Sequence, residues 1–171
     1  MLFRSRRPAA LRSTPLPVDA RELRATRERV DAFTAFAGDG ETTRQALEHL
    51  LVAPSSLHAP SEGAAQLAAA NATMDGFIAK VRAPVSRTLT LTSRAGVVPL
   101  SFQNDTGQEL QVRLRLRSDR LTFPDGNEQV LDLPPNNTTV QVRVTTSSPG
   151  SFPLLISVTS VDGRITIERT R

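Results

Sequence analysis

The sequence of 171 residues contains no cysteine, no tryptophan and no tyrosine. The absence of cysteine excludes disulfide bonds and thiolate metal sites. Without tryptophan and tyrosine, aromatic stacking on sugars or nucleobases depends on the seven phenylalanines. No stretch approaches the roughly 20 consecutive apolar residues with which a helix crosses a bilayer. The sequence therefore offers no candidate for a membrane-spanning helix.

Lysine is also nearly absent, because Lys80 is the only lysine among 21 basic residues. With 17 acidic residues, the chain carries a formal net charge of +4. Up to residue 83 there are 11 basic and 9 acidic residues, and from residue 84 onward 10 and 8, so each half carries +2. This even distribution gives no basic domain, the feature that a dedicated nucleic-acid-binding region would show.

The densest basic cluster lies at the N-terminus, in a segment rich in arginine and proline. Its members are Arg4, Arg6, Arg7 and Arg12. We interpret residues 1–16 as a disordered, solvated tail, although such charges also fit anionic lipid or nucleic acid. Arg6 and Arg7 resemble the start of a twin-arginine export signal, but no apolar segment follows them. We therefore predict no functional signal peptide.

The second half of the chain alternates apolar and polar residues, most clearly in Leu110-Gln-Val-Arg-Leu-Arg-Leu-Arg117. A period of two is that of a β-strand with one buried and one solvated face. The pattern recurs in 140–144 and 152–158, and short strands separated by turn residues are typical of a β-sandwich. We predict eight strands, near residues 88–92, 97–104, 110–117, 121–123, 129–133, 138–146, 152–160 and 164–169.

The first half instead repeats apolar residues at intervals of three and four, as amphipathic helices do. A first helix is predicted from Asp19, its N-cap, to about residue 37. A second follows a capping box of Thr42 and Gln45, and a third covers about residues 61–81. Pro84 ends this region, because proline cannot continue a helix. The predicted common core contains Phe33, Leu47, Leu50, Met74 and Phe77.

These patterns predict an α+β protein in which strand outweighs helix. The N-terminal tail, residues 1–16, precedes a segment of about three helices, residues 17–83. An immunoglobulin-like antiparallel β-sandwich of seven or eight strands follows over residues 84–171.

No group of residues predicts catalysis. Asp105-Thr-Gly107 matches the central triplet of aspartic proteases, but its neighbours differ from that pattern and a turn explains it better. His49 and His58, the only histidines, are separated by a proline-containing break and have no acidic partners at ligand spacing. Nucleotide-binding and nucleophile motifs are absent. We therefore predict no enzyme, no cofactor and no metal site, and a hydrolase is the least favoured class.

Arginines form one candidate contact surface. Arg113, Arg115 and Arg117 alternate along a single predicted strand, and Arg143 is a candidate to join them from another. A solvated face that resists edge-to-edge aggregation is the favoured interpretation, and a polyanion-binding stripe is the alternative. Interleaved aromatic residues, which favour nucleic acid, are missing from this face. Nucleic acid is therefore not the expected partner.

Polar loops form the second candidate surface, because loops on a stable scaffold commonly carry binding contacts. The loops lie at 104–109, 124–128 and 134–137. The candidate residues in them are Asn104, Asp105, Thr106, Asp125, Asn127, Asn136 and Asn137. Three of the asparagines head Asn-x-Ser/Thr triplets, which arise readily by chance in turns rich in asparagine and threonine.

Several stretches of the second half occur in an order that resembles a known family. These are Leu89-Thr-Leu-Thr-Ser-Arg94, Gly96-Val-Val-Pro-Leu-Ser-Phe-Gln-Asn-Asp-Thr-Gly107, Phe123-Pro-Asp-Gly126, Gly150-Ser-Phe-Pro153 and Val161-Asp-Gly163. They resemble the C-terminal region of an uncharacterised actinobacterial cell-envelope family, over about residues 86–170 and more weakly over 20–82. Members are large exported proteins, often encoded beside the MviN-type lipid II flippase. They end in a helical segment, an immunoglobulin-like sandwich and a transmembrane helix.

The resemblance implies an extracytoplasmic location facing the cell wall and a non-catalytic supporting or binding role near peptidoglycan synthesis. The implied partner is an envelope protein or a cell-wall polymer, and the family supplies no catalytic residues for this region. The chain departs from the family in lacking the long N-terminal ectodomain and the membrane helix expected after Arg171. A fragment of a larger membrane-anchored protein is the expectation, and a reduced relative is the alternative.

Overall fold

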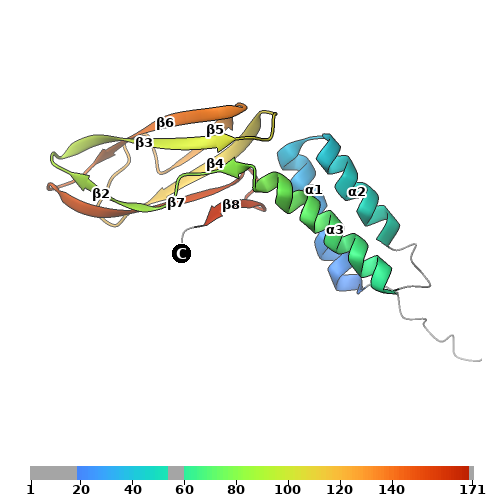
Figure 1. Ribbon diagram of the computed structural model, residues 1–171. Coiled ribbons are helices and arrows are strands. Elements are labelled where there is room, and N and C mark those ends of the chain that lie inside the picture. Colours follow the sequence, from blue (N-terminus) through green and yellow to red (C-terminus); the bar gives the residue numbers. More distant parts are fainter. Residues whose placement is uncertain (1–18, 54–59, 170–171) are drawn as a thin grey trace, which may run out of the picture.

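The computed structural model describes residues 19–53 and 60–169, so the predicted tail at 1–16 lies outside the described residues. Three α-helices precede eight β-strands in this part of the chain (Figure 1). The helices are α1 (Ala20–Ala37), α2 (Glu41–Val52) and α3 (Pro60–Ile78). The strands are β1 (Val81–Arg82), β2 (Arg87–Leu91), β3 (Ala95–Asn104), β4 (Leu110–Arg117), β5 (Glu128–Leu133), β6 (Asn136–Thr145), β7 (Gly150–Ser160) and β8 (Thr166–Arg169).

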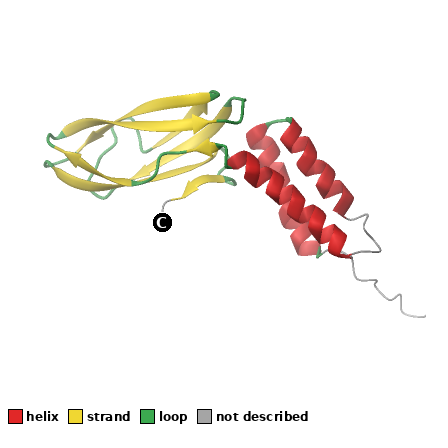
Figure 2. Cartoon of the chain, in the orientation of Figure 1, coloured by secondary structure: helices red, strands yellow, loops and turns green. Residues whose placement is uncertain are grey.

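The strands form two antiparallel sheets that face one another (Figure 2). The smaller sheet has the order β1-β3-β6, and the larger has the order β2-β7-β4-β5 with β8 also paired to β7. The chain crosses between the sheets from β1 to β2, β2 to β3, β3 to β4, β5 to β6 and β6 to β7, and repeated crossings of this kind are typical of immunoglobulin-like sandwiches. The predicted α+β class, with helices followed by an antiparallel sandwich, is confirmed.

Alternating side chains fill the space between the sheets. Leu110, Val112, Leu114 and Leu116 of β4 are all buried, and the residues between them face outward. Apolar residues of β3 and β7, such as Phe102 and Ile156, are buried with them. Each buried side chain of this size stabilises the fold by about 1.5–3 kcal/mol relative to exposure. The hydrophobic period of the sequence therefore determines which face of each sheet is inside.

The ends of α1 follow from local chemistry. The Asp19 side chain accepts a hydrogen bond from the backbone N–H of Arg21 at 2.8 Å, which makes it the predicted N-cap. Gly38 ends the helix with φ of +70°, a conformation that favours glycine. Within the helical core, the rings of Phe33 and Phe77 meet edge to face with centroids 5.2 Å apart.

The structure of α2 differs from the prediction in two ways. Gly40 is the N-cap, and as a glycine it has no side chain to make a cap bond. The hydroxyl of Thr43 donates to the Gly38 carbonyl at 2.7 Å. The predicted capping box of Thr42 and Gln45 is therefore wrong. Leu47, which was expected in the core, is 37% exposed, and Leu51, one turn later, is 74% exposed. Only part of the apolar stripe of α2 faces the other two helices.

The structure differs from the prediction at the end of the third helix and at the fourth predicted strand. The third helix was expected to reach residue 81, but Val81 pairs with Asn104 and begins β1. Residues 121–123 were expected to form a strand, and Thr122 makes only an isolated bridge with Thr145. Leu121 is buried there, which explains the strand-like pattern, but the bridged segment is too short to extend a sheet.

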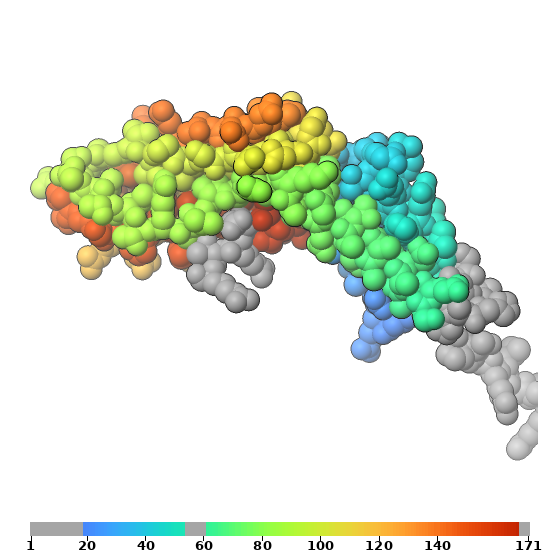
Figure 3. All heavy atoms as spheres, in the orientation of Figure 1, coloured from blue at the N-terminus to red at the C-terminus, as the bar shows by residue number. Residues whose placement is uncertain are grey.

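The helices pack on one end of the sandwich, and the space-filling view shows both parts in contact within an elongated molecule (Figure 3). One cluster of buried residues continues from Val30 and Phe33 through Val81 to Leu100 and Phe102. Two hydrogen bonds also join the parts: the Asp105 N–H donates to the Lys80 carbonyl at 3.0 Å, and Gln108 Nε2 donates to the Ala37 carbonyl at 2.5 Å.

Asn104 holds the loop that makes these contacts. Its side chain is 1% exposed. The amide Nδ2 donates to the carbonyls of Gln108 and Leu133, each at 2.8 Å, and approaches that of Pro134 at 3.3 Å. Its Oδ1 accepts from the backbone N–H and the hydroxyl of Thr106, at 3.1 and 2.6 Å. One buried amide thus ties the end of β3 to the loop 104–108 and to the end of β5.

Replacing Asn104 with alanine is expected to lower the free energy of unfolding by roughly 2–3 kcal/mol, because buried carbonyl groups lose their donor. Asn137→Ala serves as the matched control, since Asn137 is exposed on the neighbouring strand β6 and its loss is expected to cost under about 0.5 kcal/mol. Urea unfolding followed by circular dichroism measures both. Equal effects of the two substitutions would contradict this role for Asn104.

Candidate functional site

Three of the four arginines singled out in the sequence lie in a row on the outer face of β4. Arg115 faces Glu128 of β5 and donates to its Oε2 from Nε at 2.9 Å and from Nη2 at 2.6 Å. Arg113 Nη1 lies 3.2 Å from the other carboxylate oxygen of Glu128. Arg117 makes no ion pair within the described residues. A single carboxylate therefore joins two of the three arginines.

This pairing changes the electrostatics of the row. The hydrogen bond from Arg115 lowers the pKa of Glu128, and the charges of Arg115 and Arg113 act in the same direction. Asp132, on the same face of β5, accepts a hydrogen bond from Gln111 at 2.7 Å. Three arginines and two carboxylates leave this face with a formal charge of only +1. This small net charge favours the interpretation of the row as a solvated face over that of a polyanion-binding stripe.

Arg143 is not brought to this row. It lies on β6, in the other sheet of the sandwich, and its Nε donates to Asp125 Oδ2 at 2.8 Å. A second bond joins Arg143 Nη2 to Asp125 Oδ1. The hydrogen bond from Arg143 lowers the pKa of Asp125. Sequence alternation placed Arg143 on an outward face correctly but did not specify which sheet that face belongs to.

The loop 104–109, expected to be available to a partner, is largely occupied within the molecule. Asn104 is buried, and Thr106 hydrogen bonds to it. The Asp105 side chain accepts from Gln103 at 2.9 Å while its backbone binds Lys80. Of the three residues proposed here for an external partner, Asp105 attaches the sandwich to the helical segment through its backbone, and it remains exposed.

The other two predicted loops are more accessible. Asn127, Asn136 and Asn137 are exposed, and Asn136 adopts a positive φ of 85° at the turn between β5 and β6. Positive φ is tolerated by asparagine better than by most residues. Asn136 and Asn137 pair with Asn104 and Gln103 in the ladder between β3 and β6. They lie near the helices, whereas Asn127 belongs to the loop that follows β4.

That loop borders an open pocket of about 450 Å³, lined by residues 116–119, 121–123 and 126–127. β4 begins beside α1 at Leu110 and ends at Arg117, so the pocket lies roughly 25 Å further along the sandwich. The sequence identified Arg117 and Asn127 separately. The fold brings them to one pocket.

A second concave region lies where α1 and α3 meet the turn between β7 and β8. This groove has a volume of about 770 Å³, and apolar residues such as Ala32, Ile78 and Ile165 line part of it. Arg29 and Asp75 line it too and are joined by an ion pair. Across the groove, Arg164 lies 3.6 Å from Asp162, a long contact between exposed side chains.

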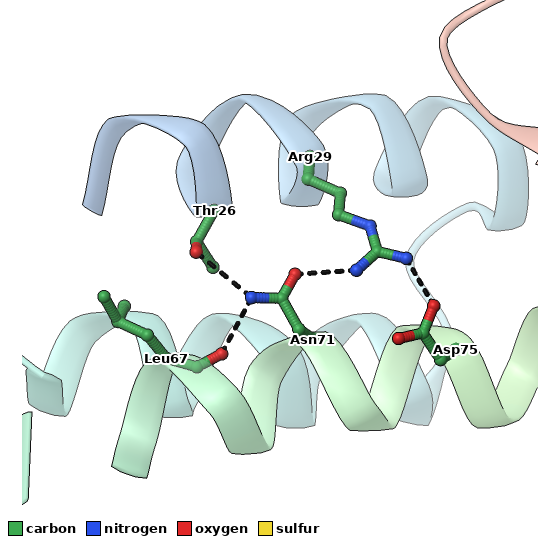
Figure 4. A network of polar contacts seen from close by, with 5 residues as sticks. All are labelled: Thr26, Arg29, Leu67, Asn71 and Asp75. Carbon is green, nitrogen blue, oxygen red and sulfur yellow. Dashed lines mark hydrogen bonds and ion pairs between the residues drawn. The ribbon is translucent and has the colours of Figure 1, made fainter. Parts of the chain in front are cut away.

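A polar network between α1 and α3 fixes Arg29 (Figure 4). Asn71 Oδ1 accepts from Arg29 Nη1 at 2.7 Å, while Asn71 Nδ2 donates to the Leu67 carbonyl at 3.0 Å and to the Thr26 hydroxyl at 3.2 Å. Our sequence analysis did not predict this network. The spacing of Asn71 and Asp75, four residues apart on one helix face, was the available signal, but nothing in the sequence specifies the partner helix.

His49 belongs to no metal site within the described residues. His49 Nδ1 lies 2.7 Å from Gln66 Oε1, and His58 lies outside the described residues. The described part of the chain contains no group of three or more His, Asp or Glu side chains placed to hold a metal ion. In that same part, no helix has the length and apolar character needed to cross a membrane.

Comparison with protein families gives a match over nearly the whole chain. The model of a family of unknown function, DUF6049, matches residues 5–170 of the chain. Comparison with curated proteins gives no match.

The ion pairs of Glu128 predict a pH dependence of stability. The pKa of Glu128 is lowered in the folded protein from an ordinary value of 4.5. The stability that its ion pairs give the fold is therefore fully present above pH 4.5, and it is lost as the pH falls through the folded pKa. The difference in unfolding free energy between the native protein and Glu128→Gln should therefore be present at pH 7 and shrink below about pH 4.5. Urea titrations across this range measure it.

Glu109→Gln provides the control, because Glu109 is exposed and makes no ion pair within the described residues. Its unfolding free energy should follow that of the native protein across the range. A Glu128→Gln difference that stays constant, or grows toward acid, would show that Glu128 does not stabilise the fold through these pairs.

Proposed function

The chain belongs to DUF6049, a family of unknown function, and we propose that it is a non-catalytic binding or structural module of a cell-envelope protein. In this proposal the module lies outside the cytoplasmic membrane as part of a membrane-anchored protein. Its partner is an envelope protein or a cell-wall polymer, in the neighbourhood of peptidoglycan synthesis.

The observation that carries the proposal is the continuous core between the helices and the sandwich. Buried residues from Phe33 to Phe102 belong to one cluster, and the loop 104–108 adds hydrogen bonds across the junction. A sandwich held against a helical bundle in this way keeps its far loops at a fixed distance from the helices. That geometry suits a spacer that presents a binding surface, since loops on a rigid scaffold commonly carry contacts.

The cellular setting is supported by the resemblance described for the sequence. The stretches between Leu89 and Gly163 resemble, in their order, the actinobacterial envelope family whose members are often encoded beside a lipid II flippase. The confirmed order of helices followed by a sandwich agrees with the architecture implied for the C-terminal region of that family.

The alternative, a polyanion or nucleic-acid binder, has less support. Glu128 pairs with Arg113 and Arg115, and Asp125 pairs with Arg143, so three of the four arginines proposed for it already have carboxylate partners. The N-terminal arginines of that alternative lie outside the described residues.

Protease accessibility tests the proposed location. The protein with an epitope tag inserted directly after Arg171 is expressed in the organism that encodes it. Intact protoplasts are then treated with a protease that cannot enter them. We expect the tag to be lost from intact protoplasts, because the module faces outward. A cytoplasmic protein in the same sample must survive the treatment.

The opposite outcome is a tag that survives in intact protoplasts and is lost only after lysis. That result would place the module in the cytoplasm and overturn the proposed function.

A further inference from the structure

The open pocket at the end of β4 has the chemistry of a ligand site. Its volume of about 450 Å³ is within the range of small-molecule sites, roughly 300–1,000 Å³. It borders the end of β4 that lies away from the helices, because β4 contacts α1 near its start and runs along the sandwich to Arg117. Its polar lining residues are Arg117, Ser118, Asp119, Thr122 and Asn127.

The charges of the pocket favour an uncharged ligand. Arg117 and Asp119 are its only charged lining residues, and neither makes an ion pair within the described residues. An anion would meet the carboxylate of Asp119, and a cation would meet the guanidinium of Arg117. A neutral ligand with both donors and acceptors would satisfy the two groups together, and the Asn127 amide adds a donor and an acceptor of its own.

Phe123 supplies an aromatic surface. It lines the pocket and is only partly buried. The other phenylalanines in the described part of the chain, Phe33, Phe36, Phe77, Phe102 and Phe152, are all buried in the core. The exposed part of an aromatic ring packs well against the C–H face of a sugar ring, whose hydroxyls point outward to polar side chains. The pocket therefore combines an apolar platform with hydrogen-bonding groups.

We propose that this pocket binds a neutral carbohydrate chain. Phe123 packs against one sugar ring, and Arg117, Asp119 and Asn127 form hydrogen bonds with the hydroxyl or acetamido groups of the chain. The proposal deepens the function given above by naming the ligand class, and it rests on that function for the cellular source of the glycan. The carbohydrate enters from solvent and no bond is broken.

Titration of the purified, ¹⁵N-labelled full chain with neutral oligosaccharides tests the proposal. The probes are chito-, cello- and malto-oligosaccharides at millimolar concentration. We expect at least one of them to shift the amide signals of residues 117–127 in a saturable way. Arg117→Ala and Asn127→Ala should each weaken that binding about tenfold, the ratio that corresponds to about 1.4 kcal/mol.

Arg120→Ala is the matched control, because Arg120 is an exposed arginine of the same loop that does not line the pocket. Its affinity should equal that of the native protein. The amide spectrum of each variant without ligand shows whether the fold is retained, and a variant that fails this check is replaced by Asn127→Asp, which keeps the shape of the side chain and removes its donor.

Three results would overturn the proposal. The first is the absence of saturable shifts with all three probes, and the second is a set of shifts that maps outside residues 117–127. The third is an equal loss of affinity in Arg120→Ala, which would indicate general charge rather than a site. Binding of a peptide in the pocket, with no response to the sugars, belongs to the first case. Failure here leaves the outcome of protease accessibility unaffected, so the two proposals can fail separately.

Discussion

The buried amide of Asn104 is the interaction on which the arrangement of the two parts depends. It ends β3, fixes the loop 104–108 and binds the last residues of β5. From this fixed loop, Asp105 and Gln108 bind the backbone of the helical segment at Lys80 and Ala37. An asparagine buried with all its hydrogen-bonding groups used gives directional bonds that apolar packing alone does not supply. With the loop fixed in this way, the helices and the sandwich meet in one relative orientation, and the shared hydrophobic core fills the space between them.

This arrangement divides the surface of the molecule by role. The end of the sandwich near the helices makes contacts within the molecule. On the outer faces of the sandwich, Arg113, Arg115 and Arg143 form ion pairs with carboxylates. Arg117 and Asp119 are an exception, because neither makes an ion pair within the described residues and both line an open pocket. The two proposals agree on this division, with a support at one end and a contact surface toward the other.

Much of the fold follows from local patterns in the sequence. The strand at 110–117 was predicted to the residue, because its apolar and polar residues alternate without a break and the apolar ones are the buried ones. The N-cap at Asp19 was also recoverable from local chemistry. The errors arose where partners distant in sequence decide. Val81 leaves the helical pattern to pair with Asn104. Leu47 is 37% exposed because only part of the apolar stripe of α2 faces the other helices. The partners of the outward-facing arginines were harder to predict. Alternation shows that an arginine faces outward, but it does not show that Glu128 or Asp125 lies within ion-pair distance of it.

The central claim is that the helices and the sandwich are one structural unit joined at the loop 104–108. Native-state hydrogen exchange as a function of denaturant measures this directly, by comparing amides of α1 and α3 with amides of β3, β4 and β7. The account predicts that the most protected amides of both parts exchange through the same global opening, with one free energy and one denaturant dependence. Helix amides that lose protection at lower denaturant, while the strands stay protected, would contradict it.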